Sequence, residues 1–243
     1  MSTALTFDPE LAYPSYDRPF LESWNGRFEA VLVVLHPFFK LPDVQPVQQG
    51  YVVTPHARSV SGQVAFKDAS KRFVDEPNPA LAKVFRSSAL LASIGQPDGV
   101  EWIETAQRLT WEEVADQAEL GSALRVGAAL SAVIGGLRKE FVVQSDVEHL
   151  ISFSEQKNVF LPSEGSFQPI LLSPLADLFA LSGTTILYQS EFDSDPVQTL
   201  TADDLKAGLP WRGALYDPAK THLAVIDWDS HFMLVAGPRA DLE

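Results

Sequence analysis

Three side chains capable of chemistry alternate along one short segment near the end of the sequence. Asp227, Asp229 and His231 lie between two apolar runs, Leu223 to Ile226 and Phe232 to Val235. Apolar runs around a polar cluster are typical of a β-hairpin. If the backbone stays extended, the three side chains point to one face, because side chains alternate with a period of two. This arrangement predicts a zinc or hard-cation site, or a carboxylate and imidazole pair for proton transfer.

The same residues also have a purely structural interpretation. Asp hydrogen-bonds its own backbone in turns, and Ser and His are ordinary turn residues. Trp228, between the two aspartates, then lies on the opposite face as a packing residue. The polar end of the hairpin is therefore either a site or only a turn.

A second candidate site is cationic. His56 and Arg58, with Ser59 and Ser61 beside them, form a compact cluster of cationic and hydroxyl side chains. Such groups bind a phosphate or a carboxylate through charge-assisted hydrogen bonds. The alternative is an arginine in a polar turn that makes ordinary surface contacts.

Acidic residues gather toward the C-terminus. Residues 158–243 hold 12 acidic and 4 basic residues, a net charge of −8, and the whole chain carries −14. The carboxylates that alternate from Glu191 do not fit an EF-hand, because the glycine and glutamate that its loop requires are missing. One interpretation of this segment is a solvated loop closed by Pro196. The other is that four aspartates, Asp193, Asp195, Asp203 and Asp204, belong to a surface that recognises a basic protein partner.

The composition excludes several classes of protein. A net charge of −14 opposes binding to nucleic acid or to an anionic membrane surface. The absence of cysteine excludes disulfides and thiolate nucleophiles. None of the strings GxGxxG, GxxxxGKS/T, GxSxG or HExxH occurs, and no cofactor is predicted.

The sequence predicts neither export nor a membrane segment. Its N-terminal residues lack a basic stretch followed by an apolar one, and Asp8 and Glu10 lie where a signal sequence is uncharged. We therefore expect a cytoplasmic protein. The least polar stretches, Val126 to Leu137 and Pro169 to Gly183, are too short to span a bilayer.

Hydrophobic periodicity divides the chain into an N-terminal arm, a helical middle and a mixed C-terminal part. Phe20, Leu21 and Trp24 should pin the arm, and Thr110 with Glu113 forms a capping-box pattern. Strands are expected at 30–35, 51–54, 60–66, 158–161, 184–189, 213–216, 223–226 and 232–235, and helices at 78–95, 110–117, 122–139, 170–181 and 201–207.

These elements predict an α+β fold, with the helical middle packed on a mainly antiparallel sheet that ends in a C-terminal hairpin. A three-layer, doubly wound α/β fold is the alternative. We expect a single domain over 1–243, with room for two lobes: a strand and helix lobe at 1–143 and an acidic α+β lobe at 158–243. The polar stretch 144–157 would separate them.

In its final third the chain resembles small acidic bacterial proteins, among them toxin-immunity proteins. Those proteins end in an apolar strand, a turn similar to WDSHF (here Trp228 to Phe232) and a second strand. The resemblance contains no diagnostic motif and assigns no functional residue. A binding role is indicated by the C-terminal acidity and by the missing catalytic strings.

Two functions are compatible with the sequence. The first is a binding or interaction protein, immunity-like in that it recognises a basic partner. The second is a hydrolase or metal-dependent enzyme that uses Asp227, Asp229 and His231.

Overall fold

The computed structural model describes residues 7–14, 17–42, 46, 100–133, 138–191, 195–208, 212–226 and 230–243. The chain divides into two compact units, each assembled from segments that are distant in sequence. Unit 1 combines Met1–Pro37, Pro97–Ala106 and Pro162–Glu243, and unit 2 combines Phe38–Gln96 and Gln107–Leu161. The strands expected at 51–54 and 60–66 and the helix expected at 78–95 lie outside the described residues.

Unit 1 is built on a six-stranded sheet in the order β1-β8-β7-β6-β4-β5. Its strands are β1 (Ala30–Leu35), β4 (Ile186–Ser190), β5 (Gln198–Leu200), β6 (Gly213–Tyr216), β7 (Leu223–Ile226) and β8 (Phe232–Gly237). Every pair of neighbouring strands in this sheet is antiparallel. The expected α+β class is therefore confirmed, and the antiparallel pairing rules out the doubly wound α/β alternative.

The expected C-terminal hairpin is formed by β7 and β8, whose register runs from Leu223 opposite Ala236 to Ile226 opposite Met233. Strand β8 also pairs along its other edge with β1, where Leu35 lies opposite Phe232. The last strand of the chain therefore lies between the first strand and β7.

Both faces of this sheet carry apolar side chains, which explains why its strands read as continuous apolar runs. On one face lie Ile186, Tyr188, Leu215, Ala224, Ile226, Met233 and Val235. On the other lie Leu187, Ala214, Tyr216, Leu223, Val225, Leu234 and Ala236. Successive residues of each strand alternate between the two sets, as the pleat requires.

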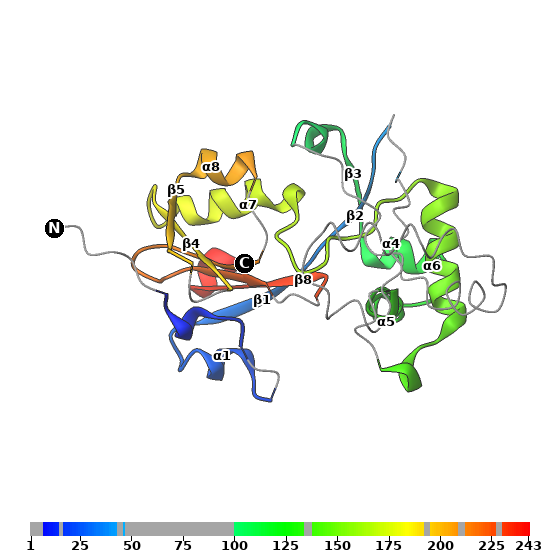
Figure 1. Ribbon diagram of the computed structural model, residues 1–243, viewed down its shortest axis with the longest axis horizontal. Coiled ribbons are helices and arrows are strands. Elements are labelled where there is room, and N and C mark those ends of the chain that lie inside the picture. Colours follow the sequence, from blue (N-terminus) through cyan, green and yellow to red (C-terminus); the bar gives the residue numbers. More distant parts are fainter. Residues whose placement is uncertain are drawn as a thin grey trace. The chain divides into compact units, whose positions relative to one another are not determined.

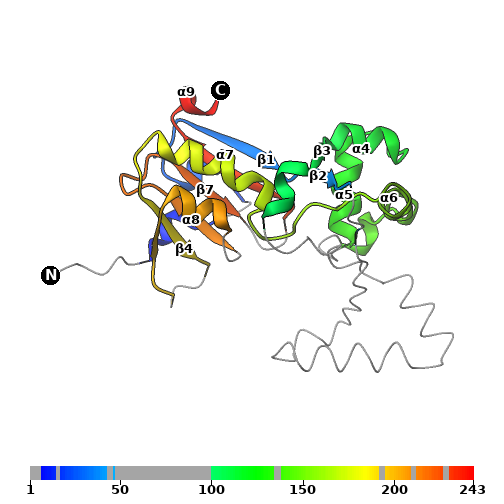
Figure 2. The same ribbon diagram turned by 90° about the horizontal axis from the view of Figure 1, so that it is seen from above.

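Two helices cover the first face, α7 (Pro169–Ala180) and α8 (Ala202–Ala207). Helix α7 begins with a proline in its first turn, where the missing N–H has no helical partner to lose. Its buried residues Leu172, Leu175, Ala176 and Phe179 recur at helical spacing and face the sheet. In Figures 1 and 2 these helices, yellow and orange, lie together over the strands of unit 1.

The N-terminal arm covers the second face through η1 (Pro9–Leu11) and α1 (Phe20–Ser23). Trp24 is buried there, and Phe20 and Leu21 pack against the same cluster, which confirms the expected pinning of the arm. Unit 1 also contains η3 (Glu101–Thr105) and the C-terminal helix α9 (Arg239–Leu242).

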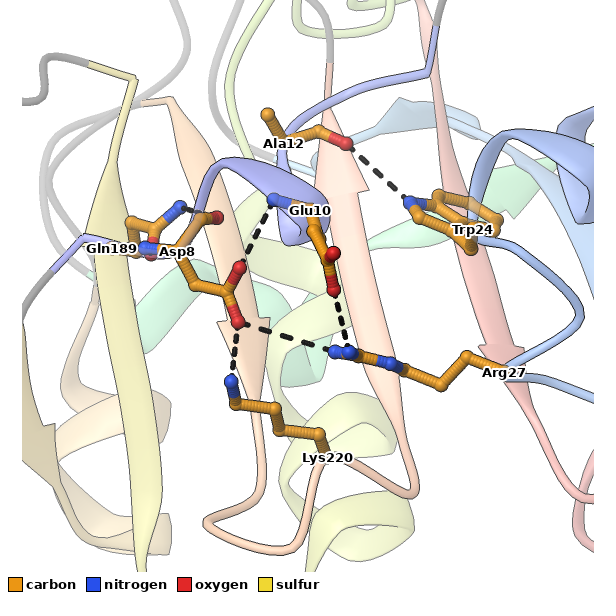
Figure 3. A network of polar contacts seen from close by, with 7 residues as sticks. All are labelled: Asp8, Glu10, Ala12, Trp24, Arg27, Gln189 and Lys220. Atoms are coloured by element: carbon orange, nitrogen blue, oxygen red, sulfur yellow. Dashed lines mark hydrogen bonds and ion pairs between the residues drawn. The ribbon is translucent and has the colours of Figure 1, made fainter.

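A polar network ties the arm to the sheet (Figure 3). Asp8 exchanges two hydrogen bonds with Gln189 of β4: its N–H donates to Oε1 at 2.7 Å and its carbonyl accepts from Nε2 at 3.0 Å. The Asp8 carboxylate is in contact with the Lys220 ammonium and lies 3.9 Å from Arg27. Burial raises the pKa of Asp8, but hydrogen bonds from Lys220 and the Glu10 N–H, with the charges of Lys220 and Arg27, outweigh burial and lower it.

Unit 2 pairs the short strands β2 (Phe38–Lys40) and β3 (Gln107–Leu109). Its helices are α4 (Trp111–Gln117), α5 (Ala123–Val133) and α6 (Gln144–Lys157), with the 3-10 turn η4 (Lys139–Phe141). The expected capping box is present, since Thr110 Oγ1 accepts from Glu113 N–H while the Glu113 carboxylate accepts from Thr110 N–H.

Helices α5 and α6 are joined by a two-pronged contact between Arg125 and Asp146. Arg125 Nε donates to Asp146 Oδ2 at 2.8 Å, and a second guanidinium nitrogen donates to Oδ1. The hydrogen bonds from Arg125 lower the pKa of Asp146. A bidentate pair of this kind fixes direction as well as distance, so it sets the register of the two helices.

Two sequence expectations within unit 2 have a different outcome. The polar stretch 144–157, expected to separate two lobes, forms helix α6, and the division into lobes stays a prediction. The strand expected at 158–161 is reduced to a single bridge between Phe160 and Phe39, because left-handed Asn158 ends α6 directly before it. Of the helices in the described ranges, none is both long and apolar enough to cross a membrane.

Candidate functional site

Three of the four aspartates that the sequence predicts for partner recognition lie in the segment of strand β5 and helix α8. Asp195 precedes β5, Asp203 and Asp204 occupy the first turn of α8, and all three are exposed. Carboxylates are favourable in this turn because the helix N-terminus carries partial positive charge. The fourth, Asp193, lies outside the described residues.

Asp204 has a structural role that separates it from Asp203. Its Oδ2 accepts from Thr201 N–H at 2.8 Å and from Thr201 Oγ1 at 2.7 Å, and its own N–H donates to Thr201 Oγ1 at 3.1 Å. The hydrogen bonds from the Thr201 side chain and backbone lower the pKa of Asp204. This capping box stabilises α8. Of the predicted aspartates that the structure describes, Asp195 and Asp203 are then the two available to a partner, and we name this pair the acidic surface.

The basic residues of the C-terminal third do not neutralise the acidic surface, because each is engaged elsewhere. Lys206 lies 3.2 Å from Asp177, Arg212 lies 3.5 Å from Glu191, and Arg239 lies 4.0 Å from Glu243. Lys220 contacts Asp8 of the arm. Within the part of the chain that the structure describes, neither Asp195 nor Asp203 forms an ion pair.

The hairpin end places His231 beside a second histidine, His36. The His36 N–H donates to the His231 carbonyl at 2.9 Å, one residue beyond the pairing of Leu35 with Phe232. Both rings direct Nδ1 at the carbonyl oxygen of Ser163, at 2.9 Å from His36 and 3.3 Å from His231. Since a carbonyl can only accept, each Nδ1 carries the proton of its ring.

Burial lowers the pKa of His36 to about 4. The charge of His231 also lowers this pKa, and the hydrogen bond to Ser163 raises it by less than burial lowers it. His36 is therefore neutral at pH 7. The loop before α7 closes over this end of the sheet through two further bonds: Gly165 N–H donates to the Ser230 carbonyl at 2.9 Å, and Gln168 Nε2 donates to the Pro37 carbonyl at 3.0 Å.

The other predicted site residues are outside the structural description. Asp227 and Asp229 fall between β7 and β8, in residues that the structure does not describe. The anion-site candidates His56 and Arg58 also lie outside the described residues. Among the residues that are described, no three or more His, Cys, Asp or Glu side chains are grouped so as to hold a metal ion. A site at Asp227, Asp229 and His231 stays a prediction.

Comparison with models of protein families identifies the family of the chain. A model described as a protein of unknown function, DUF2711, matches residues 73–243, well over half of the sequence. The chain belongs to the DUF2711 family. Neither the curated proteins nor the solved structures contain a match to it.

The DUF2711 match includes the acidic surface and His231, whereas the N-terminal arm and His36 precede it. Sequence reasoning did not connect His36 with His231, although the signal was present. His36 follows one apolar strand and His231 precedes another. Antiparallel pairing of these two strands, once assumed, would have placed the two histidines side by side.

Proposed function

We propose that this DUF2711 protein is a binding protein whose acidic surface, Asp195 and Asp203, recognises a basic protein partner. One observation carries the proposal. All four basic side chains of residues 158–243 lie in ion pairs with other carboxylates, whereas Asp195 and Asp203 are exposed and have no such pair among the described residues.

Electrostatics supports this role in two ways. A net charge of −14 attracts a cationic protein over a distance and speeds the encounter. At contact, Asp195 and Asp203, which have no ion pair among the described residues, can meet lysine or arginine of the partner without first breaking such a pair. Neutralising a basic protein, as an immunity protein does, is one activity of this kind.

The test neutralises the acidic surface without unfolding it. Asp195→Asn with Asp203→Asn removes two charges and leaves Asp204, which caps α8, in place. Immobilised wild-type protein should capture basic proteins from a lysate of the source organism, and less of them as salt rises. The double variant should capture roughly 2- to 30-fold less, since exposed charge pairs contribute about 0.2–1 kcal/mol each.

The matched control is Glu119→Gln with Glu140→Gln, which makes the same change in net charge on exposed residues of unit 2. It should capture as much as the wild type. Capture of only acidic proteins, of none, or equal capture by the double variant would remove the basis of the proposal.

The second candidate is an enzyme or metal site at Asp227, Asp229 and His231. The position of His36 favours it: metal-binding imidazoles commonly donate their second ring N–H to a carbonyl, and both His36 and His231 are hydrogen-bonded to Ser163 in this way. Elemental analysis of purified wild-type protein and of Asp229→Asn decides the metal version, which requires metal in the first and a loss in the second.

A further inference from the structure

A buried imidazole in unit 1 joins an exposed hydroxyl to a carboxylate. His222, directly before β7, is only 2% exposed. Its Nδ1 lies 2.5 Å from Oγ of Ser182, which follows α7, and its Nε2 lies 3.0 Å from Oδ2 of Asp241 in α9. Ser182 itself is exposed. Three separate elements of the fold thus meet at one ring.

The chemistry of the two neighbours sets the tautomer of His222. An ionised carboxylate accepts only, so Asp241 requires the proton on Nε2. Nδ1 of the neutral ring is then an acceptor for a hydroxyl proton, and Ser182 Oγ, at 2.5 Å, lies nearer to it than Thr221 Oγ1, at 3.3 Å. In this arrangement, the imidazole can take the proton of the serine hydroxyl while the carboxylate holds the ring in place. The hydroxyl lies at Nδ1 and the carboxylate at Nε2, which is the reverse of the usual Ser-His-Asp triad.

The ring of His222 is held from several sides. The buried carboxylate of Asp217 accepts from the backbone N–H of His222 at 2.6 Å and from the backbone N–H of Ala219 at 3.1 Å. Phe179 packs edge-on against the imidazole, with ring centroids 6.5 Å apart. Gly237 leaves the room that the ring occupies, since a Cβ there would lie 2.8 Å from His222 Cδ2. The ring therefore has little freedom to turn away from Ser182.

We propose that Ser182 is the nucleophile of an acyl-transfer centre, with His222 as its general base and Asp241 as the residue that positions and stabilises the imidazolium. The proposal is independent of the acidic surface. The substrate class is a small acyl ester, because a serine oxygen activated by a base attacks an acyl carbon and Ser182 is an exposed residue that a small ester can approach from solvent. A second hydroxyl, Thr221 Oγ1, lies 3.1 Å from Ser182 Oγ, close enough to hydrogen-bond to the reacting oxygen.

The reaction is a two-step exchange. Ser182 Oγ attacks the acyl carbon as its proton passes to His222 Nδ1, and collapse of the tetrahedral intermediate breaks the bond to the alcohol oxygen, which takes the proton from Nδ1. The products are the alcohol and an ester on Ser182. Water then attacks this ester with Nδ1 as its base, which releases the carboxylic acid and restores the hydroxyl.

The test uses a fluorophosphonate, which reacts with an activated serine by the same first step: Oγ bonds to phosphorus, fluoride leaves, and the proton goes to His222. Full-length protein should take up one equivalent, and peptide mass spectrometry should locate it on Ser182. Ser122, whose hydroxyl accepts from Arg125 N–H at the start of α5 and which no imidazole contacts among the described residues, is the internal control and should stay unlabelled. Hydrolysis of p-nitrophenyl acetate should depend on the same residue.

Variants separate activation from folding. Ser182→Ala should abolish labelling, and His222→Gln should slow it by about 10²- to 10⁴-fold, the usual contribution of a general base. Asp241→Asn should slow it while leaving the melting temperature close to that of the wild type. Absence of labelling in wild-type protein, labelling at another serine, or an unchanged rate in Asp241→Asn and His222→Gln would overturn the proposal.

Discussion

The two ends of β8 hold buried histidines in contrasting surroundings. At its beginning, His231 and His36 both direct Nδ1 at the neutral carbonyl of Ser163. At its end, Gly237 lies against His222, whose two nitrogens contact a hydroxyl and a carboxylate. The first arrangement gives its two rings a neutral acceptor, and the second places one ring between a hydroxyl and a carboxylate.

The contrast shows that burial alone does not give a histidine its role. His36 and His222 are both almost fully buried in the same unit. A carbonyl neighbour offers no compensating charge, so protonation of His36 is opposed by burial. At His222 the neighbour is instead the carboxylate of Asp241, which holds the ring in one orientation.

The largest expected effect is on the acid stability that depends on His36. Its pKa of about 4 in the folded protein lies below the ordinary 6.5, so the unfolded chain binds more protons between these values. Stability is complete above pH 6.5 and falls as the pH drops toward 4, by about 3 kcal/mol for a shift of this size. Denaturant unfolding at pH 7 and pH 4 measures the loss.

His36→Gln is the matched variant, because its amide can still donate to Ser163 but does not titrate. Its stability should fall about 3 kcal/mol less over the same pH range. Asp8, Asp146 and Asp204, whose pKa values are lowered, act below this window. Equal losses in wild type and variant would show that His36 is not held neutral.

A smaller effect is expected from filling the space beside His222. Gly237→Ala places a methyl group 2.8 Å from Cδ2 of the ring, and the overpacking should reduce the free energy of unfolding by about 1–3 kcal/mol. In a His222→Ala background the same change should cost much less, because the ring it strikes is gone. A double-mutant cycle by denaturant titration measures this coupling, and additive effects would contradict it.

The smallest effect is expected from Ser182→Ala. Ser182 is an exposed residue, and Thr221 Oγ1, 3.3 Å from His222 Nδ1, can replace its hydrogen bond, so the free energy of unfolding should fall by less than about 1 kcal/mol. Thermal and denaturant unfolding check this value. A loss several times larger would mean that Ser182 serves to hold His222 in the fold. The histidines at both ends of β8 would then have structural roles.

Local patterns in the sequence predicted most of the described elements of unit 1 and the capping box of unit 2. Proline at the start of α7, threonine before α8 and the apolar runs of β1, β7 and β8 each act over a few residues, so their effect is legible without the fold. Helix α6 was missed because its residues are polar and its apolar face is narrow.

The contacts of the candidate sites were much less predictable. Ser182, His222 and Asp241 are 40 and 19 residues apart, and no local spacing marks them. The ion pair of Lys220 with Asp8 spans 212 residues. Such contacts follow from strand order and helix docking, which alternating hydrophobicity does not specify. The exception is His36 with His231, because pairing two adjacent strands is enough to join them.

The pairing of β1 with β8 has a consequence for how the protein is made. Ala30 pairs with Gly237, and the whole of unit 2 lies between these strands in sequence. During synthesis β1 therefore leaves the ribosome long before its partner, while unit 2 has all its residues available to fold. Until β8 arrives, the run AVLVVL of β1 has no native strand to pair with, and it is open to association with other nascent chains.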